Sequence, residues 1–171
     1  MHDLAVTAVG RDQPGIVAAV TEVLHERGGN LEDSAMTILG GHIAIVLLVA
    51  TEDSEEALRN ALTAATERLG LTISVSRADA DRVDAEPTHL LSVYGSDRPG
   101  IVAGVTAAIA EVGASITDLE TQVIAGEDTA VYAMVIEVVA TDPEALASRV
   151  GEVCRELGVD HTLRTIEVET Y

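Results

Sequence analysis

The chain has 171 residues, a formal net charge of −19 and ten basic residues, all of them arginine. So few positive charges make a poor surface for phosphate groups, which excludes direct nucleic-acid binding and binding to an anionic membrane. Three tyrosines are the only large aromatic residues, too few for sites that stack nucleobases or flavins.

The first half of the chain alternates apolar runs with turn-forming residues. Ile16, Val20, Val23 and Leu24 share one face of a predicted helix, and two adjacent glycines at 40–41 predict a tight hairpin. In chain order we expect a strand at 3–9, a helix at 14–27, strands at 31–39 and 42–51, a helix at 54–69 capped by Ser54, and a strand at 71–77.

The second half repeats this order. Residues 12–18 return at 97–103, an offset of 85 (97 − 12), and 12 of the 24 positions in 10–33 are identical in 95–118. Such a match predicts two copies of one unit. In the second copy we expect strands at 89–94, 114–124, 130–140 and 159–168, helices at 99–112 and 143–157, and a turn at 125–129. The predicted boundaries are a first domain at 1–79, an acidic linker at 80–87 and a second domain at 88–171.

Each copy therefore has the order strand, helix, strand, strand, helix, strand. Two crossover units joined by a hairpin predict an α+β fold of two ferredoxin-like domains, each an antiparallel sheet with both helices on one face. The strand at 42–51 is apolar on both sides, because Ala44, Val46 and Leu48 alternate with further aliphatic residues. A sheet with one solvated face should alternate with polar residues instead. We therefore expect the second face to be covered by the other copy, by a second chain or by both, and we expect a homodimer.

The repeated segment combines a strand end, a turn and a helix start. Asp12 can cap the helix, and Pro14 suits a first helical turn. The free N–H groups of Gly15, Ile16 and Val17 would then face outward at the positive end of the helix dipole, where a small anion such as a carboxylate can bind. The alternative is a capped strand-to-helix turn that binds nothing.

The other chemistry-bearing residues give weaker signals. Cys154 is the single cysteine, which excludes an internal disulfide and is typical of a reducing compartment. Its helical pattern predicts a small core or edge residue. None of the five histidines has metal-ligand spacing, so we expect surface or edge positions for them, no metal and no cofactor. There is no signal-peptide pattern and no membrane-length apolar run; we expect a cytoplasmic protein.

Two sequence segments in each copy together resemble the ACT domain. The first is Asp-x-Pro-Gly-Ile-Val, at 12–17 and 97–102, and the second is Gly-Gly-Asn-Leu-Glu-Asp at 28–33 or Gly-Ala-Ser-Ile-Thr-Asp at 113–118. This is a small ferredoxin-like module that binds amino acids and regulates metabolic enzymes. The resemblance covers nearly the whole chain. A tandem pair of this kind is similar to the glycine cleavage system transcriptional repressor type.

The resemblance implies a ligand site between the first strand–helix loop of one module and the start of the second strand, at an interface of paired modules. The implied ligand is a small amino acid, glycine or serine first, and the implied partner is a regulator or metabolic enzyme. The implied ligand-binding residues are Asp12, Gln13, Gly15, Ile16, Val17, Asn30, Leu31 and Asp33 in the first copy, and Asp97, Arg98, Gly100, Ile101, Val102, Ser115, Ile116 and Asp118 in the second. Copy two has Ser115 in place of Asn30 and Arg98 in place of Gln13, so the two sites are expected to differ or only one to bind. Asp33 and Asp118 can equally be local turn or edge-strand charges.

Three hypotheses follow. The first is an amino-acid-sensing regulatory module without catalytic residues, and the second is an interaction module that keeps the fold and lacks a ligand. The third is a small hydrolase. Residues 79–83, Asp-Ala-Asp-Arg-Val, superficially resemble the nucleophile motif of haloacid-dehalogenase phosphatases, to which tandem ACT modules are fused. That class uses a lysine, which this chain lacks, and we interpret the segment as linker.

Overall fold

The computed structural model describes residues 1–78, 86–125 and 130–166. The chain divides into two compact units, Met1–Arg82 and Val83–Tyr171. Most of the predicted linker, residues 126–129 of the turn predicted at 125–129 and the end of the last predicted strand lie outside the described residues. The segment at 79–83 that resembles a phosphatase motif lies outside them as well.

Both units have the predicted ferredoxin-like order. Unit 1 contains β1 (His2–Arg11), α1 (Ile16–Glu26), β2 (Asn30–Leu39), β3 (His42–Thr51), α2 (Glu55–Thr66), the 3₁₀ turn η1 (Glu67–Leu69) and β4 (Thr72–Arg77). Unit 2 contains β5 (His89–Ser96), α3 (Ile101–Glu111), β6 (Ser115–Ala125), β7 (Ala130–Val139), α4 (Pro143–Leu157) and β8 (Asp160–Thr165).

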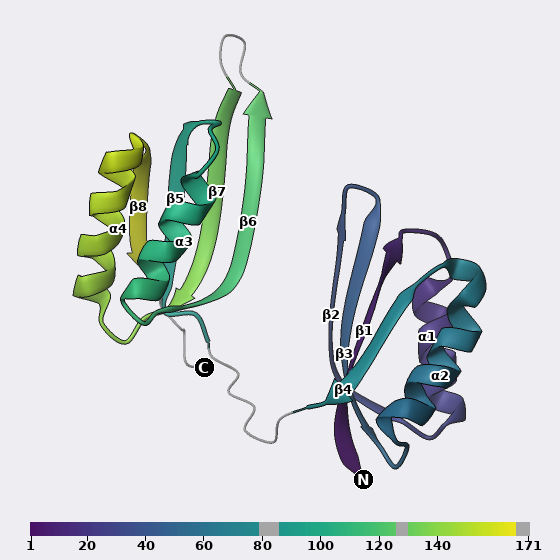
Figure 1. Ribbon diagram of the computed structural model, residues 1–171. Helices are drawn as coiled ribbons and strands as arrows, with labels where there is room; N and C mark the ends of the chain where they lie inside the picture. The colour runs from purple at the N-terminus through teal and green to yellow at the C-terminus, as the bar shows by residue number, and fades with distance from the viewer. Residues whose placement is uncertain (79–85, 126–129, 167–171) are drawn as a thin grey trace. The chain divides into compact units, whose positions relative to one another are not determined.

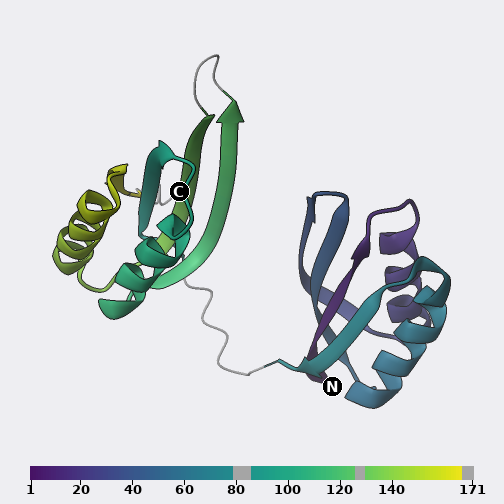
Figure 2. The same cartoon turned by 45° about the horizontal axis from the view of Figure 1, so that its top comes forward.

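Each unit is a four-stranded antiparallel sheet, with strand orders β2-β3-β1-β4 and β6-β7-β5-β8. The two helices of each unit lie side by side on one face of its sheet (Figures 1 and 2). The predicted α+β fold is therefore confirmed. The β2–β3 hairpin turns through Gly40 and Gly41, whose φ angles of 57° and 77° are both positive, as the tightest hairpin turns require.

The core of each unit lies between its sheet and its helices. The predicted inner face of α1 is confirmed, since Ile16, Val20, Val23 and Leu24 are its buried residues. On β3, Ile43, Ile45, Leu47 and Val49 face this core. Val46, on the opposite face of the same strand, is 46% exposed.

Two predictions about these elements were wrong. Near the end of α2, Ala65 is exposed and Thr66 is buried, and the Thr66 hydroxyl donates to the carbonyl oxygen of Leu62 at 2.8 Å. The predicted single helix at 54–69 changes to a 3₁₀ turn at Glu67, so its last residues do not continue the α-helical face. His89 was expected at the surface but is buried, with its Nδ1 2.8 Å from the Thr88 hydroxyl oxygen.

Candidate functional site

The candidate site begins at the two helix starts that follow β1 and β5. Gly15 and Gly100 are the N-cap residues of α1 and α3, with φ angles of 94° and 96°, and no side chain caps either helix. The prediction that Asp12 caps the helix and that Pro14 lies in its first turn was therefore wrong. The helix begins after the left-handed glycine, so both residues lie in the loop before it.

The reason for glycine at these two positions is conformational. A Cβ built at Gly15 or Gly100 would meet nothing within 4 Å, so the space there is open. A positive φ is costly for residues that carry a Cβ. The first turns of α1 and α3 contain no acidic residue.

The other two helices begin differently. Ser54 caps α2 by accepting a hydrogen bond from the Ala57 amide at 3.2 Å, and Asp142 caps α4 by accepting one from the Ala145 amide at 2.9 Å. Both also carry glutamate in the first turn. The chain therefore places side-chain caps and negative charge at α2 and α4, and neither at α1 and α3.

The side chains predicted around these helix starts differ in how far they are exposed to solvent. Ile16 and Ile101 are core residues, 1% and 2% exposed, so only their backbones can face a ligand. Val17 and Val102 are partly exposed on the first turns, at 46% and 36%. Asp12 and Asp97 are exposed in the loops, where the Asp12 amide donates to the carbonyl oxygen of Gly41 at 2.9 Å.

Gln13 and Arg98 point to the second helix of their own unit. Gln13 Nε2 donates to the carbonyl oxygen of Leu69 at 2.8 Å, and the Arg98 guanidinium donates to the carbonyl oxygen of Leu157. The resemblance to the ACT domain implied a ligand contact for both side chains. The sequence gave no signal for these carbonyl partners, which lie 56 and 59 residues away.

The remaining predicted residues lie at the starts of the edge strands β2 and β6. Asn30, Leu31 and Asp33 are exposed, as are Ser115, Ile116 and Asp118. The ladder is irregular at the same place in both units, between Leu31 and Asp33 and between Ile116 and Asp118. Such a bulge redirects the side chains on either side of it. Within β2, Asp33 Oδ1 accepts a hydrogen bond from the Ser34 amide at 2.7 Å.

Within one unit, the predicted residues at the helix start and those at the start of the edge strand lie far apart. Arg11, at the helix-start end of β1, pairs with His42, whereas Asp3 pairs with Ala50 at the other end, and Ala50 also pairs with Asn30. The two ends are eight residues of strand apart (11 − 3), or roughly 26 Å at about 3.3 Å per residue. Figure 1 shows the same arrangement, with the β1–α1 loop beside the tip of the β2–β3 hairpin.

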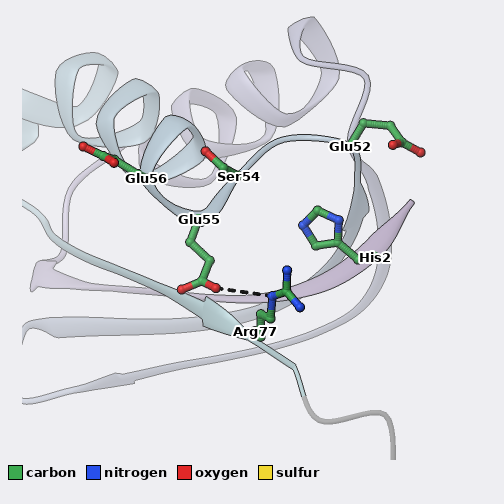
Figure 3. A pocket seen from close by; sticks show the side chains of 6 residues that line it. All are labelled: His2, Glu52, Ser54, Glu55, Glu56 and Arg77. Carbon is green, nitrogen blue, oxygen red and sulfur yellow. Dashed lines mark ion pairs between the residues drawn. The ribbon is translucent and has the colours of Figure 1, made fainter.

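The described surface of unit 1 includes two hollows. One, of about 110 Å³, is lined by Asp33, Ser34, Ala35, Val46 and Leu48 beside the β2 irregularity. The other, of about 390 Å³, lies where α2 begins and β4 ends, and is lined by His2, Glu52, Ser54, Glu55, Glu56 and Arg77. Its Glu55 and Arg77 form an ion pair at 3.6 Å (Figure 3). The larger hollow contains none of the predicted ligand residues.

Charged pairs elsewhere join elements at the surface. Arg149 on α4 donates to Glu111 on α3 at 2.6 Å, and this hydrogen bond lowers the pKa of the Glu111 carboxyl. Cys154 is buried in the core of unit 2, which confirms the first of its two predicted positions, core or edge. This burial raises the pKa of its thiol. Among the described residues, no group of three or more His, Cys, Asp or Glu side chains is placed to hold a metal ion. No described helix is long and apolar enough to cross a membrane.

Comparison with known proteins decides the family. A family model described as the ACT domain matches residues 2–76 and again residues 88–164. The chain belongs to the ACT-domain family. Each unit is thus one ACT domain, and together the two matches cover most of the chain.

Relatives share one or both ACT domains. The chain is 24% identical over 172 residues to the glycine cleavage system transcriptional repressor of Escherichia coli, covering 96% of this chain and 90% of that protein. It is 33% identical over 109 residues to a phosphoserine phosphatase of Mycobacterium tuberculosis, but covers only 26% of that enzyme. A crystal structure of a protein of unknown function from Galdieria sulphuraria matches 97% of the chain and 99% of its own, with a TM-score of 0.84 at 30% identity.

Proposed function

We propose that this tandem ACT protein senses a small amino acid, glycine or serine first, and controls a metabolic enzyme or a transcriptional regulator through protein–protein contacts, without catalysing a reaction itself. The observation that carries the proposal is the pair of ACT-domain matches over 2–76 and 88–164. ACT domains are regulatory modules that bind small amino acids. The relative that matches over nearly the whole length of this chain is named a transcriptional repressor.

The helix starts support an acidic ligand group. In a chain of net charge −19, the first turns of α1 and α3 carry neither acidic residues nor side-chain caps. Unpaired amides at a helix start favour a carboxylate, and the helix dipole adds to this preference. We assign the carboxylate of the amino acid to the amides that follow Gly15 and Gly100.

The polar residues at the start of β2 that could accept from the ammonium group do not lie beside these amides in the same unit. Asn30 and Asp33 lie at the far end of the sheet from Gly15. We therefore propose that a site containing both groups forms in a homodimer, where the start of β2 from a second chain approaches the helix start. An Asn amide and an Asp carboxylate are suitable partners for a zwitterion.

Isothermal titration of the full chain with the twenty amino acids, glycine and serine first, tests this proposal. Gly15→Asp and Gly100→Asp place a carboxylate at each helix start, and Gly15→Asn and Gly100→Asn are matched controls, since Asn has the same shape and tolerates positive φ. We expect the dissociation constant for the amino acid to rise at least tenfold more in the aspartate variants than in the asparagine variants. Flat titrations of the natural chain for all twenty amino acids would reject the sensor.

A ligand-free interaction module is the second candidate, and the edge strand β2 favours it. All ten of its residues are exposed, among them Met36 at 56%, Ile38 at 51% and Leu39 at 80%. Exposed apolar residues in one place indicate a protein-contact surface. A partner that binds the chain equally well with and without glycine or serine would support this module against the sensor.

A further inference from the structure

The same contact occurs once in each ACT unit and involves two different side chains. Gln13 donates to the carbonyl oxygen of Leu69, which ends the 3₁₀ turn after α2, and Arg98 donates to that of Leu157, which ends α4. The two side chains occupy equivalent positions, 85 residues apart (98 − 13). Each acceptor is followed by a glycine in the left-handed conformation, Gly70 or Gly158.

We propose that Gln13 and Arg98 are positioning residues: each fastens the loop before Gly15 or Gly100 to the C-terminal end of the second helix, and neither contacts the ligand. The inference rests on the proposed function for its role in binding. An amide and a guanidinium share few properties beyond N–H donors on a long side chain. Both side chains nevertheless donate to the equivalent carbonyl oxygen. We therefore infer that the role of residues 13 and 98 is to connect the loop to the second helix.

The acceptor is suited to such a connection. The last four carbonyl groups of a helix have no partner within the helix and carry partial negative charge. A donor from the loop satisfies one of them and fixes the loop two residues before the left-handed glycine. In unit 1 the Asp12 amide also bonds to Gly41 at 2.9 Å, so neighbouring residues of the loop are held to two different elements.

The two units differ in the strength expected of this contact. Arg98 brings a full positive charge to a helix C-terminus, and charge-assisted hydrogen bonds are stronger than neutral ones. Its guanidinium also lies close to Gly158, where an added Cβ would be 3.4 Å from it. The loop at 97–100 should therefore be more rigid than the loop at 12–15.

The test uses the full chain with Gln13→Ala and Arg98→Ala, and with the donor-retaining exchanges Gln13→Arg and Arg98→Gln. Arg59→Ala, which removes an exposed arginine on α2, is the control for charge. Backbone ¹⁵N order parameters are measured at residues 13–17 and 98–102, and titration with glycine and serine gives the affinity. Thermal unfolding reports any general loss of structure.

We expect the alanine variants to lower loop order parameters from about 0.85 towards 0.6 in the affected unit only, and to weaken binding there by about two- to tenfold, the range for one hydrogen bond. The exchanged variants should keep both properties within about twofold. Unchanged order parameters in the alanine variants would overturn the proposal, as would weaker binding with a loop that stays rigid, because that result indicates direct ligand contact. If the natural chain binds neither glycine nor serine, titration with the other amino acids decides the proposed function, and the order parameters alone decide whether these residues hold the loop.

Discussion

At the scale of single residues, the glycines at 15 and 100 show how one backbone angle determines the character of the candidate site. Both have open space where a Cβ would lie, so contact with a neighbour does not explain them. Their positive φ starts the helix without a side-chain cap. Pro14 and Pro99 precede them and fix one further angle each. The Pro-Gly dipeptide thus leaves the start of each helix without a side-chain cap.

Cys154 gives a prediction at the same scale. Its side chain is 0% exposed, and burial raises the pKa of its thiol above the ordinary value. Only the thiolate reacts readily, so iodoacetamide should label the native chain far more slowly than the urea-unfolded chain at pH 8, measured by mass spectrometry. The raised pKa also makes the free energy of unfolding depend on pH. The stabilisation from burying the neutral thiol is complete below the thiol pKa of the unfolded chain and is lost as the pH rises towards the thiol pKa of the folded chain. Equal labelling rates in the two states would contradict the burial.

At the scale of elements, the four helices form two classes. Ser54 and Asp142 cap α2 and α4 with their side chains, whereas α1 and α3 begin at a left-handed glycine. In each unit the capped helix is the second one. Arg98 donates to the last carbonyl of α4, and Gln13 donates to the last carbonyl of the 3₁₀ turn that follows α2. Side chains therefore form hydrogen bonds near both ends of the second helical segment, whereas no side chain caps the start of the first helix.

Removing the caps tests this distinction. Ser54→Ala and Asp142→Ala should each lower the free energy of unfolding by about 1 kcal/mol, since alanine cannot accept the amide hydrogen bond. Asp142→Asn and Ser54→Asn should recover most of the loss. Urea unfolding followed by NMR signals assigned to each unit measures the effect and shows whether it is confined to the mutated unit. An alanine variant as stable as the natural chain would show that the cap contributes nothing.

Much of each unit was predictable because local pattern and fold agree. The bounds of β3 and α4 match the prediction, since glycine, threonine and proline mark their ends clearly. The sequence did not reveal the change to a 3₁₀ turn at Glu67 or the irregularities of β2 and β6, which depend on how strands and helices pack. The candidate site was the hardest part. Gly15 and Asn30 are near in sequence, but α1 runs the length of the sheet between them and places them at opposite ends.

At the scale of the whole molecule, the uncovered sheet faces raise the question of assembly. In each unit by itself the helices cover one face only. The other face of unit 1 carries Ala44, Val46 and Leu48 from β3 and Ala35 from β2, and Val46 is 46% exposed. Apolar area of this kind is stabilised by contact with another surface. The expected coverage of this face, and the homodimer, remain predictions.

Val46→Glu tests whether this face is used for self-association. A dimer that uses this face would have to bury the new charge without its hydration, which costs free energy. The variant should therefore shift from dimer to monomer at micromolar concentration, measured by analytical ultracentrifugation. Ala64→Glu adds the same charge at an exposed position on α2 and should leave the dimer intact. Because the natural chain carries a net charge of −19, two copies repel each other and added salt screens that repulsion. The dimer of the natural chain should therefore tighten between 50 and 500 mM salt. A natural chain that stays monomeric throughout, or a Val46→Glu variant that dimerises equally well, would show that this face does not join two chains.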